Sequence, residues 1–411
     1  MLSPSFRVAP PSAPPSGPPH LPPSSRGQRG GLAAVSIHAT GDTSSIIRAL
    51  QRAFAMVQKP AGLLLFATGN PGPAADPEAI LEAVRAIMGP VPTVLAIGSG
   101  VRTETAEHED TSALTGILWR QGRARTVGLE RDAAPTDDFG SALATQVRAG
   151  GGCASALILF GQGDYLSSHS LADLAGHLEP TVVFGAGTRA TGVWRIGSDG
   201  QIEHGPVAGI ALHGMMTPIV RPAAACKLIT PLAPITAVQG SVVLTIAERS
   251  ALTVLSAGSK ALHGQSLVLS VIARGSTNHD LGNADEILVR GIRGVDPTRG
   301  GIVVSDDVEP GMLMVFGVVE ASTAKQQLSR VLRESSRQLA GGAPHFGLML
   351  SCSGRVKSFY ATPQVELGLF RERFPQVPMA GVLAPFEIAP FGGPATLHLY
   401  TTVVALFAAP S

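Results

Sequence analysis

The chain has 411 residues, of which 45% are hydrophobic and 15% charged, with a formal net charge of +1 at pH 7. This length is enough for two or three domains with buried cores, and so small a net charge gives no electrostatic basis for binding nucleic acid or an anionic membrane surface. The three cysteines, Cys153, Cys226 and Cys352, are widely spaced and include no CxxC pair. They predict free thiols in a reducing, cytoplasmic compartment, and neither a disulfide framework nor a thiolate metal site.

The two ends of the chain carry no clear targeting or membrane signal. Nine of the 32 prolines fall within residues 1–30, together with three arginines and no acidic residue. Such a segment buries too little apolar surface to offset the entropy of ordering, so residues 1–31 are predicted to be a disordered tail or an over-extended start of the reading frame. The longest apolar run, 397–409, is shorter than the roughly 20 residues of a transmembrane helix, which predicts a buried strand and no membrane insertion.

From residue 34 onwards, one pattern occurs three times. Each copy has an apolar strand, an amphipathic helix, a proline, a second strand that runs into a glycine turn, and a closing strand. The paired strands are expected at 63–66 and 94–98, at 157–160 and 182–185, and at 348–351 and 379–381, with closing strands near 116–118, 209–212 and 403–406. Each copy also has an upstream strand and helix, the strands being expected at 34–37, 126–129 and 312–319.

A repeat of about 50 residues built from strands and helices determines the architecture. We predict a mixed α/β fold of strand-helix-strand-helix-strand-strand modules, with packed mixed sheets under outer helices. The equivalent glycine turns are predicted to converge on one hollow.

The repeats also predict the domain organisation. Two copies form an N-terminal domain at 32–217. A proline-rich segment at 218–240 bridges to a C-terminal domain at 241–409, which has one copy and a β-rich insertion with short strands near 242–246, 267–269, 287–289 and 302–304.

Several common site motifs are excluded. The segment Gly185–Ala190 matches GxGxxA, but the following residues predict a strand and a turn instead of the helix that a dinucleotide site needs. No P-loop and no GxSxG motif occur, and the histidines show no HExxH or HxH spacing. We therefore expect no cofactor and no metal.

Two carboxylates occupy matching places in the repeats. Glu104 lies six residues after Gly98, and Glu387 lies six residues after Gly381. A carboxylate just beyond such a turn can accept hydrogen bonds from a ligand amine or hydroxyl. The alternative is that it caps neighbouring backbone or faces solvent, which the surrounding acidic residues favour for Glu104.

Cys352 and Arg355 follow the end of a predicted buried strand. The thiol is a candidate nucleophile if a base such as His345 or His398 lowers its pKa, although the sequence orients neither histidine. The alternative is that Cys352 is a small apolar core residue and that Arg355 is an ion-pair partner or an anion contact.

The region from His345 to Phe407 resembles the C-terminal half of the FIST family, named after F-box and intracellular signal-transduction proteins. The residues that carry the resemblance are Ser351–Arg355, Gly381–Pro390 and Leu397–Thr401. Upstream, Ala225–Lys227 and Pro234–Val242 are similar to the family's inter-half signature, and Gly98–Glu104 and Gly205–Gly214 to its N-terminal half. The resemblance covers the chain from about Ala33 to Ala409.

This resemblance implies a sensory module that binds small molecules such as amino acids; in eukaryotes the family also occurs behind an F-box in ubiquitin-ligase receptors. The chain contains no F-box or output domain, so its signalling partner is expected to be separate or absent. Phe386 stands where the family commonly has glycine, which would reshape a pocket.

We therefore expect a non-enzymatic protein that binds an amino-acid-like metabolite in a cleft between the two halves. Glu387 and Arg355 would pair with its ammonium and carboxylate groups. The expected ligand-binding residues are Ser99, Glu104, Arg189, Cys226, Cys352, Arg355, Gly381 and Glu387. The alternatives are an enzyme that uses Cys352 on an amide or thioester, and a protein-interaction scaffold related to F-box receptors.

Overall fold

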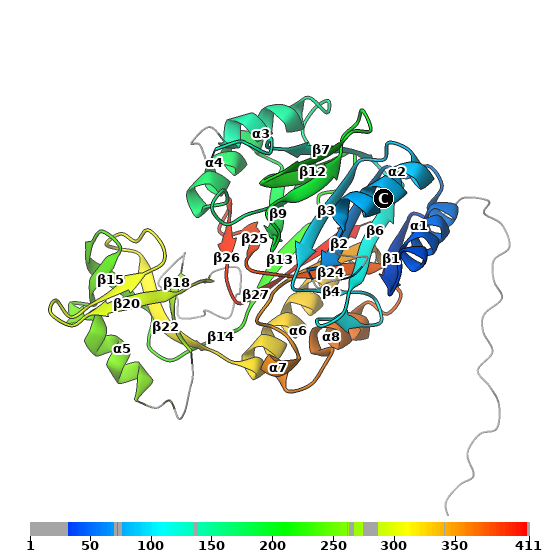
Figure 1. Ribbon diagram of the computed structural model, residues 1–411. Coiled ribbons are helices and arrows are strands. Elements are labelled where there is room, and N and C mark those ends of the chain that lie inside the picture. The colour runs from blue at the N-terminus through cyan, green and yellow to red at the C-terminus, as the bar shows by residue number, and fades with distance from the viewer. Residues whose placement is uncertain are drawn as a thin grey trace, which may run out of the picture. The chain divides into compact units, whose positions relative to one another are not determined.

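The computed structural model describes residues 32–69, 72, 76–134, 139–260, 262, 267–273, 287–340 and 342–408. The predicted tail at 1–31 lies outside these residues. Leu32–Ser411 group into one compact unit. Its fold is mixed α/β, with helices on the outer faces of several mixed sheets (Figure 1).

The three predicted copies form three modules. Module 1 contains β1 (Ala34–Thr40), α1 (Thr43–Val57), β2 (Gly62–Thr68), α2 (Pro77–Met88), β3 (Thr93–Gly98) and β6 (Ala113–Trp119). Module 2 contains β7 (Arg123–Gly128), α3 (Phe139–Arg148), β8 (Ala156–Gly161), α4 (Ser168–Leu178), β9 (Val182–Gly187) and β12 (Val207–His213). Module 3 contains β13 (Ile219–Ala224), α6 (Ala321–Gln338), β23 (Pro344–Cys352), α7 (Lys357–Tyr360), α8 (Val365–Arg373), β24 (Met379–Ala384) and β27 (Thr401–Ala408).

The strand order is the same in all three modules. It reads β1-β6-β2-β3 in the first, β7-β12-β8-β9 in the second and β13-β27-β23-β24 in the third. In each module the two central strands around the helix are parallel, and the closing strand is antiparallel to its neighbours. The repeat read from the sequence is therefore a repeat of topology as well.

Local sequence signals start the helices of these modules. The Asp42 carboxylate accepts a hydrogen bond from the Ser45 amide at the start of α1, and Asp76 caps α2 just before Pro77. Each carboxylate satisfies a backbone donor that the first helical turn leaves unpaired.

The structure differs from the sequence prediction in module 3. The segment 312–319 is predicted as the upstream strand of this module, but the strand found there, β22 (Leu313–Val319), belongs to another sheet. Its place is taken by β13, which lies in the predicted bridging segment and pairs with β27 from Ile219↔Leu406 to Ala224↔Thr401. The segments 219–224 and 312–319 are both apolar enough to form strands. Only the pairing of β13 with β27 shows which of them belongs to module 3.

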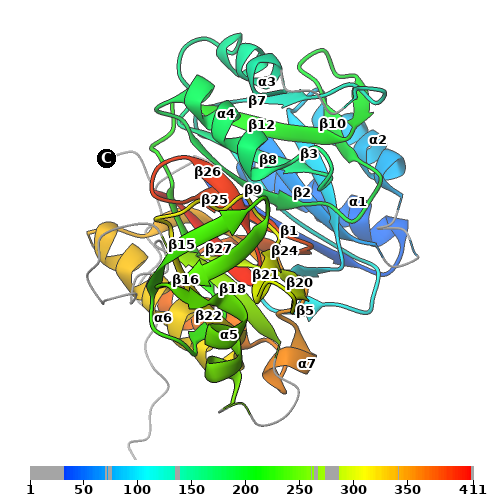
Figure 2. The same ribbon diagram turned by 90° about the vertical axis from the view of Figure 1, so that its left-hand side faces the viewer.

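The described residues between β13 and α6 form a nine-stranded sheet of their own, which we call the inserted sheet (Figure 2). Its strands are β14 (Cys226–Leu228), β15 (Ala233–Gln239), β16 (Val242–Ile246), β17 (Arg249–Ser250), β18 (Val268–Ala273), β19 (Ile287–Arg290), β20 (Ile292–Asp296), β21 (Gly301–Val304) and β22, and α5 (Ala251–Ser259) contacts it. It has a separate apolar core that includes Ile235, Val243 and Phe316.

Each module also contributes a hairpin to the sheet of another module. The hairpin β4 (Gly100–Arg102) and β5 (Glu107–His108) extends the sheet of module 3 beyond β24. The hairpin β10 (Val193–Ile196) and β11 (Ile202–Gly205) extends module 1, and the hairpin β25 (Glu387–Pro390) and β26 (Ala395–His398) extends module 2. The exchange passes from module 1 to 3, from 3 to 2 and from 2 to 1, so it closes a ring.

The exchange brings the glycine turns together, as the repeats predict. Their backbones pack against one another, and the turn at Gly98 also borders a cavity. A Cβ atom on Gly98 would lie 2.4 Å from Val382 Cγ2, so this contact requires glycine. The three sheets share one core with side chains from every module, including Phe66, Phe160, Phe184, Phe346 and Phe407. The backbone bonds at the turns run from Ser99 N to Leu383 O (2.9 Å), from Arg189 N to Ile97 O (2.8 Å) and from Gly187 N to Phe386 O (2.8 Å).

Candidate functional site: a cleft beside the inserted sheet

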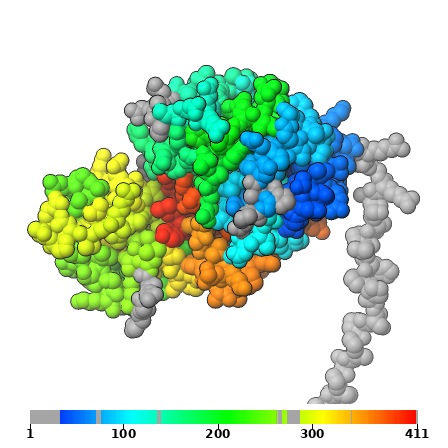
Figure 3. Space-filling model, in the orientation of Figure 1, coloured from blue at the N-terminus to red at the C-terminus, as the bar shows by residue number. Residues whose placement is uncertain are grey.

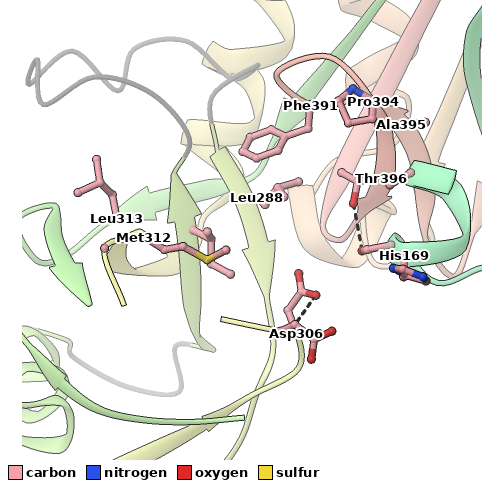
Figure 4. Close-up of a pocket in the computed structure, with 14 residues that line it drawn as sticks. His169, Leu288, Asp306, Met312, Leu313, Phe391, Pro394, Ala395 and Thr396 are labelled. Atoms are coloured by element: carbon pink, nitrogen blue, oxygen red, sulfur yellow. Dashed lines mark hydrogen bonds between the residues drawn. The ribbon is translucent and has the colours of Figure 1, made fainter. Parts of the chain in front are cut away.

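A cleft of about 560 Å³ lies between the inserted sheet, helix α4 and the β25–β26 hairpin (Figure 4). Figure 3 shows the red surface of the C-terminal residues between the yellow surface of the insertion and the blue-green surface of module 2. The volume falls in the range of small-molecule sites, about 300–1,000 Å³. The cleft thus joins segments that lie far apart in the sequence.

One side of the cleft is apolar. Met312 and Leu313 at the start of β22 lie beside side chains from β18, from β19 and from the turn after β25. Most of these side chains are nearly buried, but Met312 is 37% exposed, which is unusual for so large an apolar residue. The remaining apolar residues of this side are Ile272, Leu288 and Phe391.

The other side of the cleft is polar. Ser168 and His169 come from the first turn of α4, and Thr396 comes from β26. Asp306 and Asp307 come from the loop that follows β21. A few polar groups beside an apolar wall are the usual composition of a ligand site.

Arg290 connects the three elements around the cleft. Its side chain is buried, and its Nε atom forms an ion pair with Asp306. Nη1 donates to the Leu397 carbonyl oxygen (3.0 Å), and Nη2 donates to Ser168 Oγ (3.4 Å). Thr396 Oγ1 also donates to Ser168 Oγ, at 3.0 Å. Strand β19, helix α4 and strand β26 are therefore held together by one compensated guanidinium group.

The eight residues predicted from the sequence lie in several places, and none of them lines this cleft. Ser99 and Arg189 line a second cavity, of about 440 Å³, where β2 and β3 end. Glu104 lies in the loop after β4, and its carboxylate accepts a hydrogen bond from Ser36 Oγ (2.6 Å). Cys226 is buried in β14, and burial raises its pKa to about 12.

The other four predicted residues belong to module 3. Gly381 lies in β24 and pairs with Met349 and Arg102 on the adjacent strands. Cys352, Arg355 and Glu387 are close enough for each to affect the ionisation of another. All three are buried, at 7%, 1% and 0% exposure.

Arg355 is an ion-pair partner, one of the alternatives left open by the sequence. Its Nε lies 2.6 Å from Glu366 Oε1, and its Nη1 donates to the carbonyl oxygens of Ala223 and Tyr400. Glu366 also pairs with Arg102 at 2.6 Å and accepts a hydrogen bond from the Tyr360 hydroxyl. This buried network joins the hairpin of module 1 to module 3.

The carboxyl group of Glu387 is fully buried. Neither of its oxygens has a hydrogen-bond partner among the described residues. Burial raises the pKa of Glu387 well above its ordinary value, and Arg355 and the backbone amide of Thr401 offset this only in part. The folded chain therefore holds the proton of this carboxyl group more tightly than the unfolded chain does.

Sequence reasoning missed Arg290, Asp306, Arg102 and Glu366. A signal exists for two of them. Arg290 ends the otherwise apolar strand Ile287–Arg290, and Glu366 precedes the buried Leu367 in α8. A charged residue at a position that the periodicity assigns to the core is almost always paired.

The structure weighs against an activated thiol at Cys352. Burial and, secondly, the neighbouring Glu387 raise the pKa of Cys352 to about 11. The candidate base His398 is buried and contacts the Ala389 carbonyl oxygen; burial and then Arg290 lower its pKa to about 3. The thiol is thus protonated at neutral pH, and thiols in that state are poor nucleophiles.

We expect iodoacetamide at pH 7.5 to modify the exposed Cys153 while Cys352 and Cys226 remain unmodified, because both of the latter are buried and protonated. Peptide mass spectrometry over time measures this, and the same protein in urea, where all three must react, is the control. Modification of Cys352 as fast as Cys153 would favour the enzymatic alternative.

Two further classes of site can be checked over the described ranges. None of the helices there is long and apolar enough to cross a membrane. In the same ranges no group of three or more His, Cys, Asp and Glu side chains is arranged to hold a metal ion.

Comparison with known proteins gives distant relatives. The uncharacterized protein Rv0628c of Mycobacterium tuberculosis is 32% identical over 122 residues, which are 30% of this chain and 32% of that protein. The uncharacterized protein Mb0898c of Mycobacterium bovis is 27% identical over 253 residues, which are 59% of this chain and 63% of that protein. The chain thus spans about a third of the first relative's length and under two thirds of the second's.

Among solved structures, T. maritima PurL complexed with FGAR aligns over 92% of this chain and 75% of that chain, with 10% identity. Its TM-score of 0.19 is too low to support an argument about fold or function.

Two family models match consecutive parts of the chain. The FIST N domain matches residues 61–249, and the FIST C domain matches residues 249–390. They confirm the resemblance noted in the sequence. The chain therefore belongs to the FIST-domain family, a family of sensory domains.

Proposed function

We propose that this chain binds a small polar metabolite as a sensory module, and that the binding site is the cleft beside the inserted sheet. The observation that carries the proposal is the cleft itself, with about 560 Å³ of volume, an apolar wall and a few polar groups. Membership of a sensory family supports a signalling role. A separate protein would receive the signal.

The position of the cleft suggests how ligand binding could change the arrangement of the elements around it. Its lining comes from the inserted sheet, from α4 of module 2 and from the hairpin of module 3, and Arg290 already links these elements. A ligand that contacts all of them favours the arrangement in which they are held together. It shifts the equilibrium between arrangements by its difference in affinity for them.

A thermal-shift screen of amino acids, amines, organic acids and nucleotides tests this proposal. At least one compound should stabilise the chain, by about 2.7 kcal/mol at a hundredfold excess over Kd. The variant Ala172→Trp should abolish the response, because Ala172 is exposed on α4 and lines the cleft, where an indole would fill the space.

The variant His177→Trp serves as the control. His177 is exposed on the same helix but does not line the cleft, and its side chain makes only an exposed ion pair with Asp173. This variant should bind like the original chain. The proposal fails if no compound stabilises the protein, or if Ala172→Trp responds as strongly as His177→Trp.

A further inference from the structure

We infer that the cleft selects a cationic amine on an apolar body, in preference to an amino acid or an organic acid. This inference rests on the proposed function and narrows it to a ligand class. It depends on three observations: the charges of the lining, the existing ion pair and hydrogen bonds of Arg290, and the apolar wall.

The described lining has two acidic side chains, Asp306 and Asp307, and no lysine or arginine. His169 is its only other titratable residue. The net charge of the described lining is therefore negative.

Arg290, which contacts two lining residues, cannot serve a ligand carboxylate. Arg290 is 3% exposed, and its guanidinium group is held by Asp306, Ser168 and backbone carbonyl oxygens. A ligand carboxylate would have to displace Asp306 from an ion pair that is already formed and largely desolvated, which gives no net gain in charge pairing.

Asp307 remains as the uncompensated charge. Asp306 Oδ2 is paired with Arg290, and Asp306 Oδ1 accepts a hydrogen bond from the Asp307 amide (3.0 Å). The Asp307 side chain is exposed and has no partner among the described residues. A ligand ammonium group beside it would gain a charge-assisted hydrogen bond, whereas a ligand carboxylate there would meet repulsion without a compensating cation.

The apolar side of the cleft would bind the hydrocarbon part of the ligand. Met312, just before β22, and Leu313, its first residue, line the cleft together with Phe391 (Figure 4). Covering these side chains with a hydrocarbon group removes apolar surface from water on both partners. A branched or aromatic amine fits this combination, since it has one cationic end and an apolar remainder.

A matched series of small molecules tests the inference at pH 8, where imidazole side chains are neutral and alkylamines remain cationic. The probes are 3-methylbutylamine, 3-methylbutan-1-ol, leucine and 3-methylbutanoate, which share a branched apolar body and differ in charge. By calorimetric titration the amine should bind about tenfold more tightly than the alcohol, because a hydrogen bond between charged groups replaces a neutral one. Leucine should bind no more tightly than the alcohol, and 3-methylbutanoate most weakly.

The variant Asp307→Asn should weaken binding of the amine about tenfold and leave the alcohol unchanged. The control Glu309→Gln removes an exposed carboxylate two residues further along the same loop that does not line the cleft, and should bind all four probes like the original chain. Equal melting temperatures of both variants and the original chain show that the fold is intact, since both side chains are exposed.

The inference is overturned if leucine or 3-methylbutanoate binds as tightly as the amine, if the alcohol equals the amine, if the amine does not bind, or if Asp307→Asn has no effect. Binding of an acid or zwitterion that Ala172→Trp blocks would refute the ligand class and leave the proposed function standing. If a broad screen finds no compound that binds, both the inference and the proposed function are refuted.

Discussion

Replacing Glu366 by glutamine is expected to lower the free energy of unfolding by about 3–5 kcal/mol. Glu366 is 0% exposed and contacts Arg102 and Arg355, each through a 2.6 Å ion pair. The neutral amide keeps the shape of the side chain but removes the ion-pair partner of the buried Arg355, while Arg102 keeps its second partner, Glu107. Urea unfolding at pH 7 measures the loss.

A matched variant separates charge burial from a general effect of the substitution. Glu82 forms an exposed ion pair with Arg85 one helical turn away, at 2.6 Å. Because water screens such pairs, Glu82→Gln should change the stability by less than about 1 kcal/mol. Equal losses in the two variants would show that the buried network is not a major source of stability.

The same network determines a pH dependence. Burial alone would raise the pKa of Glu366, but Arg355 and Arg102 outweigh it and lower the pKa to about 2. Because the folded pKa lies below the unfolded one, the contribution of this carboxylate is fully present above its ordinary pKa. It is lost as the pH falls towards 2.

Unlike Glu366→Gln, the variant Glu387→Gln is expected to raise the free energy of unfolding, because it removes a destabilisation that grows with pH. Burial raises the pKa of Glu387 in the folded chain, whereas the unfolded chain loses this proton above about pH 4.5. Between the ordinary and the raised pKa the original chain therefore loses stability as the pH rises, by up to about 1.4 kcal/mol per pH unit from this group. Glutamine does not titrate, so the variant lacks this slope.

Urea unfolding of both proteins from pH 5 to pH 8 tests this expectation. The quantity of interest is the difference between the two curves, because other groups contribute equally to both. The difference should widen with pH in favour of the variant. Glu309→Gln, an exposed carboxylate solvated in both states, should give a curve parallel to that of the original chain. Parallel curves for Glu387→Gln would mean that Glu387 is ionised in the folded protein.

The equal spacing of Glu104 and Glu387 shows how a sequence pattern can mislead. Both residues lie six positions after a glycine, yet Glu104 is half-buried in a loop and Glu387 is fully buried at the start of β25. The reason is that Gly98 is the last residue of β3, whereas Gly381 is the third residue of β24. Equal distances along the chain therefore do not correspond to equal places in the modules.

The cleft could not be predicted for a related reason. Ser168, Asp306 and Thr396 lie in three different elements, and none of them belongs to a motif. They meet because the hairpin of module 3 joins the sheet of module 2 and because the inserted sheet folds beside both. The one local signal was a charged residue, Arg290, at the end of an apolar strand.

The sequence alone determined that three similar modules exist, where their central strands and helices lie, and that they form a mixed α/β fold. These features depend on hydrophobic periodicity, helix caps and turn residues, which act over a few neighbouring positions. Only the tertiary structure decided that β13 belongs to module 3, that the hairpins are exchanged in a ring, and that the cleft lies beside the inserted sheet. Those features depend on pairing between residues about a hundred or more positions apart, and apolar strands of similar composition carry no local mark of their partners.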